Sequence, residues 1–323
     1  MSSPVILPDY SFRDQKAQTS FYVLLWRRNG ISLETFDDYW RDVHGPVCAR
    51  LPGQEQYWQF HVSPSPKAIW PVMEGIKYDL LPEEQFEGIA ELTFVSEEKR
   101  QIWFNAAAIL MDDEQNIFRK AIGYTVSPGN SKTYIDRIAT GNPNGELGIV
   151  KYHVLLKKAD GVSLEDFRQY LKEEFATTVT QNQLVLKFRL HLFDAVDNSR
   201  PDAAGVVHYE PEENQYQAAF EIGFSDHLAM REFLVSAEYN IAVRSQQRYI
   251  KQISVFVERS VYTFVYNGQI TLAGQRGSRV AELITKVGAI NQLKDDISAL
   301  ISPQINSVYA TTNKITDDLV LAN

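Results

Sequence analysis

Two halves of the chain carry the same sequence pattern, and this repetition constrains the fold more than any other feature. Residues 22–36 are echoed by residues 152–167, at an offset of 130 or 131 positions. The offset persists in three further blocks: His61 with His191, 86–94 with 216–224, and 122–126 with 253–257. A shared offset over four separate blocks predicts an internal duplication of one structural unit.

Each copy follows the periodicity of strand, helix, strand, strand, helix and strand. In the first copy we expect strands at 21–27, 56–62, 88–95 and 121–126, with helices beginning after Ser32 and Ser96 as N-caps. This order is the split βαβ unit of ferredoxin-like folds. One such unit covers only one face of its sheet with helices. We therefore expect an α+β protein in which two fused ferredoxin-like βαββαβ units close on each other as an intrachain dimeric α+β barrel. The alternative is two ferredoxin-like domains packed in another way.

The repeat divides the chain into three expected parts, 1–140, 141–270 and a C-terminal helical extension at 271–323. From Val280 to Ile301 the apolar residues follow a three-and-four spacing, which predicts one amphipathic helix. Ser302 and Pro303 then predict the start of a second helix, with Ile305, Val308, Ile315 and Leu319 on one stripe. These helices either dock on the barrel or build a homo-oligomer.

Composition and charge exclude several classes of protein. The formal charge of -9 argues against a nucleic-acid partner, because binding to phosphates needs clustered Lys and Arg. Cys48 is the single cysteine, so a disulfide framework or a multi-cysteine metal site within the chain is excluded. There is no secretory signal and no apolar run of about 20 residues, so we expect a cytoplasmic protein that is not an integral membrane protein. A phosphate-binding loop and the dinucleotide fingerprint are also missing.

Alternation along the strands separates two faces of the sheet. Tyr57, Gln59 and His61 form the polar set of the second strand, and Glu91 belongs to the mixed set of the third. We therefore expect His61 beside Glu91, and the second copy repeats the pattern with His191 and Glu221. A buried His–Glu pair can serve as a tuned general base. It can equally be a structural pair, since buried polar groups need partners.

The first helix carries a specific motif. Residues 36–53 read FDDYWRDVHGPVCARLPG. This resembles the EthD-like family of the dimeric α+β barrel superfamily, in which F-x-x-Y-W-x-x-x-H-G-P follows a first strand and a Ser-x-Glu-x-Phe helix start. The match covers residues 21–53 without a gap. The second copy keeps Tyr170 but has Phe175 in place of His44, so it resembles a degenerate copy.

The resemblance implies a cleft between the sheet and the first helix. Related proteins include isomerases, cyclases, decarboxylases and cofactor-free monooxygenases, which implies a hydrophobic ligand with a carbonyl or phenol group, no metal and no cofactor. His44 is the first candidate for proton transfer, although it could also be a C-terminal helix cap. His61, Glu91 and Tyr39 could assist, but Tyr39 would lie about 140° from His44 around an α-helix. The expected substrate-binding residues are Trp40, Tyr57, Gln59, Trp70 and Tyr78.

Two long connections, at 63–85 and 195–215, exceed the usual loop length and could be lids or inert packing. Trp70 and Tyr78 come from the first of them. Two other functions stay open beside an enzyme. One is a non-catalytic binding or structural protein with an assembly tail. The other is a haem protein, because some fused α+β barrels carry haem, with His191 or His227 as the axial ligand.

Overall fold

The computed structural model describes residues 8–65, 70–200 and 203–301. Both halves show the expected order of elements. The first unit consists of β1 (Thr19–Arg27), α1 (Leu33–Tyr39), η2 (Trp40–His44), α2 (Gly45–Ala49), β2 (Gln56–Pro64), β3 (Gly88–Phe94), α3 (Glu97–Ala106), α4 (Ala108–Ile117) and β4 (Phe118–Val126). The second unit consists of β7 (Val150–Lys158), α5 (Leu164–Gln169), η4 (Tyr170–Phe175), α6 (Ala176–Val179), β8 (Lys187–Leu192), β9 (Ala218–Phe224), α7 (His227–Leu234), α8 (Ala237–Ala242), α9 (Gln246–Tyr249) and β10 (Ile250–Tyr266).

Shorter elements connect and extend the two units. These are η1 (Ser11–Asp14), η3 (Pro82–Glu84), β5 (Ser131–Asp136), β6 (Asn144–Gly145), η5 (Glu212–Asn214), β11 (Gln269–Ile270), α10 (Leu272–Arg276), α11 (Ser278–Lys286), η6 (Ile290–Leu293) and α12 (Asp295–Ile301).

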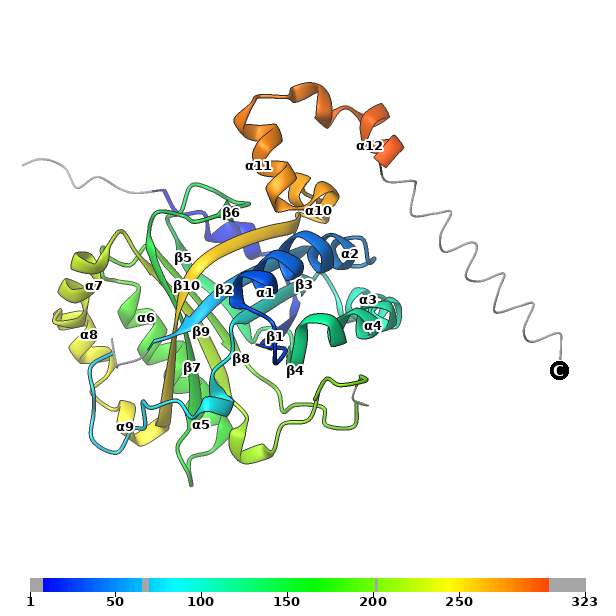
Figure 1. Ribbon diagram of the computed structural model, residues 1–323. Helices are drawn as coiled ribbons and strands as arrows, with labels where there is room; N and C mark the ends of the chain where they lie inside the picture. The colour runs from blue at the N-terminus through cyan, green and yellow to red at the C-terminus, as the bar shows by residue number, and fades with distance from the viewer. Residues whose placement is uncertain (1–7, 66–69, 201–202, 302–323) are drawn as a thin grey trace, which may run out of the picture.

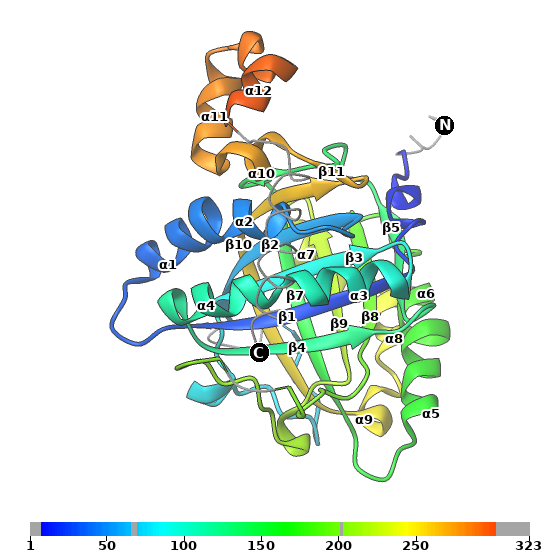
Figure 2. The same cartoon turned by 90° about the vertical axis from the view of Figure 1, so that its right-hand side faces the viewer.

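The strand order confirms the expected barrel. Each unit has the antiparallel order of a ferredoxin-like sheet, β4-β1-β3-β2 in the first and β10-β7-β9-β8 in the second. The 17-residue strand β10 pairs with β7 along its first part and with β2 along its second part. On the other side β5, which follows β4 after a short turn, pairs with β8. The two sheets are therefore joined at both edges, with helices on their outer faces (Figures 1 and 2).

The apolar core has three layers. One cluster lies between the two sheets and takes residues from both units, among them Tyr22, Phe60 and Phe256. A second lies between the sheet of the first unit and its helices, and a third lies in the same place in the second unit. A ferredoxin-like unit leaves one sheet face uncovered, and here the two uncovered faces bury each other.

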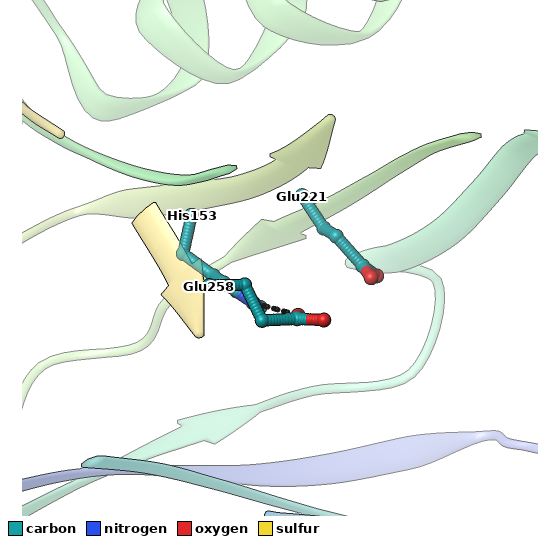
Figure 3. A group of neighbouring side chains, drawn as sticks. All are labelled: His153, Glu221 and Glu258. Atoms are coloured by element: carbon teal, nitrogen blue, oxygen red, sulfur yellow. Dashed lines mark hydrogen bonds and ion pairs between the residues drawn. The ribbon is translucent and has the colours of Figure 1, made fainter. Parts of the chain in front are cut away.

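Charged side chains also lie inside the barrel. The carboxylate of Glu221 lies 2.5 Å from the ammonium of Lys151, which is also 2.8 Å from Glu258. His153 Nε2 lies 2.9 Å from Glu258, so that three side chains with metal-ligand chemistry point toward one another (Figure 3). Burial alone would lower the pKa of Lys151, but Glu221 and Glu258 outweigh burial and raise it. The ammonium therefore already compensates these carboxylates, and the group is an ion-pair cluster.

Each long connection crosses to the other unit. We call residues 70–85 the first covering segment, and residues 195–200 and 203–215 the second. Lys77 of the first forms a parallel bridge with Gln252 in β10, and Val207 of the second forms one with Lys120 in β4. The covering segments thus lie over the helix-side layers of opposite units, a crossing that the sequence did not predict.

Glu84 ties the first covering segment to the second unit. Its carboxylate accepts hydrogen bonds from Lys157 at 2.8 Å and from Gln252 at 3.0 Å. Burial raises the pKa of Glu84, but these bonds outweigh burial and lower it to about 2. Because the pKa is depressed in the folded state, this contribution to stability is complete above the unfolded pKa of roughly 4.5 and is lost as pH falls toward 2.

The free energy of unfolding of the wild type should fall as the pH falls through the range in which Glu84 is protonated. We expect this fall to be smaller by about 2–3 kcal/mol in Glu84→Gln. Urea unfolding at pH 6, 4 and 2.5 measures the free energy of unfolding of both proteins. The exposed neighbour Glu83 provides the control, since Glu83→Gln should follow the wild-type curve. Equal pH dependence in the Glu84→Gln and wild-type proteins would contradict the assignment.

The C-terminal extension differs from the expected continuous helix. Gly288 has a φ of 66° and follows the end of α11, which separates α11 from η6 and α12. A residue with positive φ cannot continue a right-handed helix. The extension projects from one end of the barrel, and several of its large apolar side chains are exposed, including Leu283, Val287 and Ile290 (Figure 1).

Four expectations from the sequence stay predictions. The helix expected after Ser302 lies outside the described residues. Self-association through the exposed apolar side chains remains a prediction, as do the domain boundaries at 140 and 270 and a cytoplasmic location. In the part of the chain that the structure describes, no helix is long and apolar enough to cross a membrane.

Candidate functional site

The candidate site is built on the first helical segment of the first unit. Ser32 caps α1 by accepting a hydrogen bond from the backbone N–H of Thr35, as expected. The helix then changes to a π-turn at η2, where Gly45 N–H donates to the carbonyl of Trp40, five residues back. This wider turn brings residues five positions apart onto one side. The predicted angle of about 140° between Tyr39 and His44 is therefore wrong, because it assumed an α-helix.

His44 and Tyr39 share one carboxylate, that of Asp113 in α4. His44 Nδ1 lies 2.8 Å from Asp113 Oδ2, and the Tyr39 hydroxyl donates to Asp113 Oδ1 at 2.6 Å. The hydrogen bond from His44, with smaller contributions from Tyr39 and Asn116, outweighs burial and lowers the pKa of Asp113 to about 2. A carboxylate at this position favours the imidazole tautomer in which Nδ1 carries the proton and Nε2 is the acceptor. The histidine therefore makes a side-chain contact across the layer, which a simple helix cap would not do.

His44 lines a small cavity between the sheet of the first unit and its helices. The cavity has a volume of about 50 Å³, enough for a few water molecules. Its walls are mostly apolar and aromatic, and the lining residues with polar groups include His44, Cys48, Tyr57, Glu114 and Arg200. A larger ligand would need some of these side chains to move.

Two predicted substrate-binding residues line this cavity, and a third supports them. Trp40 and Tyr57 line it directly. Gln59 supports both, because its Nε2 donates to the Trp40 carbonyl at 2.9 Å and to the Tyr57 hydroxyl at 2.8 Å. A side chain at Gly45 would come within 2.6 Å of Phe264, which explains a glycine directly after the histidine.

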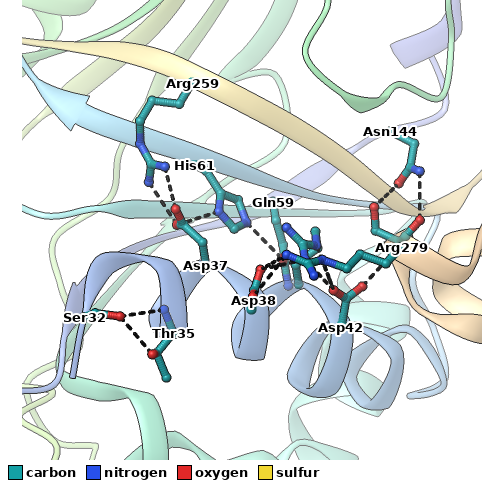
Figure 4. A network of polar contacts seen from close by, with 12 residues as sticks. Ser32, Thr35, Asp37, Asp38, Asp42, Gln59, His61, Asn144, Arg259 and Arg279 are labelled. Carbon is teal, nitrogen blue, oxygen red and sulfur yellow. Dashed lines mark hydrogen bonds and ion pairs between the residues drawn. The ribbon is translucent and has the colours of Figure 1, made fainter. Parts of the chain in front are cut away.

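His61 lies behind Trp40 rather than in the cavity wall. Its ring stacks on Trp40 at 4.6 Å between centroids, and its Nδ1 lies 2.8 Å from Asp37. Asp37 is held in turn by two hydrogen bonds from Arg259 of β10, at 2.5 and 2.9 Å (Figure 4). His61 therefore positions the Trp40 wall and links α1 to the second unit.

The expected pairing of His61 with Glu91 is wrong. In the register of β2 and β3, His61 lies opposite Gly88, whereas Glu91 lies opposite Trp58. Because successive residues of a strand point to opposite faces, His61 faces the helices and Glu91 faces the barrel interior. In the second unit Arg189 lies opposite Glu221, and His191 faces the interior.

The two matched histidines thus lie on different faces. The structural counterpart of Trp58 is Arg189, at an offset of 131, whereas the sequence match of His61 with His191 has an offset of 130. A slip of one residue in a strand exchanges its faces.

The prediction that Trp70 and Tyr78 line the same site as His44 is also wrong. Both pack against the apolar layer of the second unit, where Trp70 contacts the rings of Phe220 and Tyr239. The reason is the crossing of the first covering segment to the opposite unit. Neither residue lines the cavity beside His44.

The C-terminal extension is fixed to the helix that carries His44. Arg279 of α11 forms a two-point contact with Asp38 at 3.0 and 3.2 Å, and its backbone N–H donates to Asp42 at 3.1 Å (Figure 4). Ser278 donates to the side chain of Asn144 at 2.7 Å. The extension thus covers the outer side of η2.

Sequence reasoning missed Asp113, Glu114 and Arg200. The run Asp112-Asp113-Glu114, shortly before the last strand of the first unit, was the available signal, because a buried histidine needs an acceptor. The position of Arg200 gave no such signal, since its place depends on the crossing of the second covering segment.

The second unit has the same backbone without the polar site. Its π-turn η4 follows α5, so Gly45 and Pro46 are not needed to form this turn, since Ala176 and Thr177 replace them. Phe175 takes the place of His44, and the Tyr170 hydroxyl donates to the backbone carbonyl of Ala242 at 2.8 Å. The site is therefore specific to the first unit.

Comparison with known proteins finds a family match within the first unit. Residues 28–120 match the family model described as the EthD domain, which confirms the family resemblance. No curated protein sequence matches the chain. Similar solved structures include an anthrone oxidase-like protein (8% identity, TM-score 0.49, covering 79% of this chain and 95% of that chain). A candidate monooxygenase from Lactobacillus acidophilus NCFM (10%, 0.45, 77% and 98%) and a dye-decolorizing peroxidase from Bacteroides thetaiotaomicron VPI-5482 (10%, 0.42, 79% and 96%) are also similar.

These comparisons correct the expectation that the protein uses no cofactor. A dye-decolorizing peroxidase and a protein described as a candidate chlorite dismutase are among the similar structures. The two histidines considered as axial haem ligands, His191 and His227, do not fit that role. His191 lies inside the barrel, 3.0 Å from the Ser131 hydroxyl, and His227 is exposed at the start of α7. Neither lines the cavity beside His44.

Proposed function

Because residues 28–120 match the EthD domain model, we propose that this protein is an enzyme that processes a hydrophobic small molecule in the cavity of the first unit. One observation carries the proposal. His44 Nδ1 is bound to a carboxylate, and the ring lines an apolar cavity. A histidine that a carboxylate orients in this way can act as a general base through its other ring nitrogen.

The proposed chemistry is proton transfer at a carbonyl- or phenol-bearing ligand. His44 Nε2 takes a proton from a carbon beside a carbonyl group, or from a phenol, and Asp113 stabilises the imidazolium that forms. The Tyr57 hydroxyl lines the same cavity and can donate to the oxyanion that develops. Isomerisation, cyclisation, decarboxylation and oxygenation can each use such a transfer, and the overall reaction is one of these classes.

Hydrogen–deuterium exchange at the α-carbon of a model ketone tests the proposal without knowledge of the natural substrate. We expect the protein to catalyse exchange of the α-protons of 2-tetralone or 1-indanone in D₂O, followed by proton NMR. His44→Gln should slow this exchange by about 10²–10⁴-fold, the usual contribution of a general base. The melting temperature should change little, because glutamine retains a polar contact to Asp113.

His227→Gln serves as the matched control, since His227 is an exposed histidine of the second unit. Its exchange rate should equal that of the wild type. If the wild type exchanges no faster than buffer with either ketone, or if His44→Gln exchanges as fast as the wild type, general-base catalysis is wrong. Such a result would favour a non-catalytic binding or structural protein.

A further inference from the structure

The two covering segments carry a pair of structurally corresponding residues, one placed over the second unit and one over the first. Trp70 lies seven residues before Lys77, and Arg200 lies seven residues before Val207. Lys77 and Val207 occupy corresponding positions, because each forms a parallel bridge with the last strand of the opposite unit. Trp70 and Arg200 are therefore structural counterparts, and each is presented to the unit of which it is not a part.

Trp70 fills its side of the second unit. The side chain is 2% exposed and packs against Phe220 and Tyr239, in the same layer as Phe175. The rings of Trp70 and Phe175 thus lie in the part of the second unit that corresponds to the His44 cavity of the first. Trp70 therefore fills this space in the second unit, which also lacks a counterpart of His44.

Arg200 instead contributes a cation to the wall of the first cavity. The side chain is half-buried and lines the cavity together with His44 and Trp40. Within the described residues its guanidinium forms no hydrogen bond or ion pair. The hydrogen bonds from Ser199, and after them the charge of Arg200, lower the pKa of the exposed Asp197. An arginine beside apolar walls is a strong unused donor, since guanidinium binds carboxylates with two parallel hydrogen bonds.

The carboxylate on the same wall already has a partner. Glu114 lies 2.7 Å from His208 Nε2, and His208 belongs to the second covering segment. The segment is anchored further by the backbone bonds between Val207 and β4 and by the ion pair of Lys120 with Glu210 at 2.7 Å. The backbone that carries Arg200 is thus attached to the first unit by several contacts.

We propose that the ligand of the first cavity carries a carboxylate or an enolate-type oxyanion, which Arg200 of the second unit binds. The inference rests on the proposed function, because it takes the same cavity as the ligand site. It gives the second unit a direct part in that site, although its own counterpart of His44 is lost. An anion at Arg200 would also place the adjoining carbon skeleton against the aromatic walls.

Binding of two matched probes tests the inference. The probes are 2-naphthoate and 2-naphthamide, which share one ring system and differ in charge, and calorimetric titration gives each Kd. We expect the wild type to bind 2-naphthoate about tenfold or more tightly. Arg200→Gln should remove this preference, and Arg200→Lys should retain part of it, because the charge remains without the planar fork.

Two controls separate the outcomes. Trp70→Phe changes the counterpart residue, and Arg231→Gln changes an exposed arginine of the second unit, so both should keep the preference. Equal Kd values for the two probes in the wild type, no binding of 2-naphthoate, or an unchanged preference in Arg200→Gln would overturn the inference. His44→Gln should keep the preference while it loses hydrogen exchange, so that failure of catalysis and failure of anion binding are distinguishable.

Discussion

Replacing Glu91 by alanine is expected to lower the free energy of unfolding by about 3–5 kcal/mol. The Glu91 side chain lies inside the barrel and is 1% exposed. Its Oε1 accepts two hydrogen bonds from Arg189, at 3.0 Å from Nε and 2.7 Å from Nη2. Without Glu91, the buried guanidinium keeps its ion pair with Asp14, at 3.1 Å, and a weaker interaction with Glu221. The loss arises from an undercompensated charge rather than from a cavity.

Urea denaturation of the wild type and variants measures this effect. Glu97→Ala is the control, because Glu97 forms an exposed pair with Arg100 on α3, and such pairs contribute less than about 1 kcal/mol. The double variant Glu91→Leu with Arg189→Met should recover most of the stability, since apolar residues of similar size often replace a buried ion pair well. A loss below about 1 kcal/mol for Glu91→Ala would show that the Arg189 charge is not buried as described.

The contrast between Glu91 and His61 shows what the sequence can predict about a barrel. The order of elements followed from periodicity, and the repeat followed from its offset. The face of a given strand residue depended on registers that differ by one position between the two units. Periodicity within a single strand does not report such a slip, because both phases contain polar residues in this chain.

The candidate site was predictable only in part, because local sequence does not report contacts between distant segments. The motif around His44 and the neighbours Trp40 and Tyr57 could be identified from local sequence. Asp113 could not be paired with His44, because the pairing depends on a π-turn and on the packing of α4 against it. Arg200 depends on a segment that crosses to the opposite unit, and such long-range contacts leave no local pattern.

The second large effect concerns Asp113, which positions His44. We expect Asp113→Asn to lower the rate of hydrogen exchange by about 10²–10⁴-fold, the range seen when the orienting carboxylate of a catalytic histidine is replaced by its amide. Tyr39 and Asn116 both donate to Oδ1 of Asp113, at 2.6 and 3.0 Å. In the variant these donors hold the amide oxygen, so the amide nitrogen faces His44 Nδ1. The proton of His44 must then move to Nε2, where it prevents the ring from accepting a proton from the ligand.

The matched control is Asp112→Asn, one residue earlier and exposed, which should exchange like the wild type. Nitrogen NMR of the histidine rings gives a direct readout, because His44 should change from the Nδ1–H to the Nε2–H tautomer in Asp113→Asn. Tyr39→Phe in the same background removes one donor to Oδ1, so the amide can turn and part of the activity should return. An Asp113→Asn protein with wild-type exchange would show that the carboxylate does not set the tautomer of His44. Loss of exchange without a tautomer change would assign the effect to displacement of α4 instead, and the melting temperature would then fall with the rate.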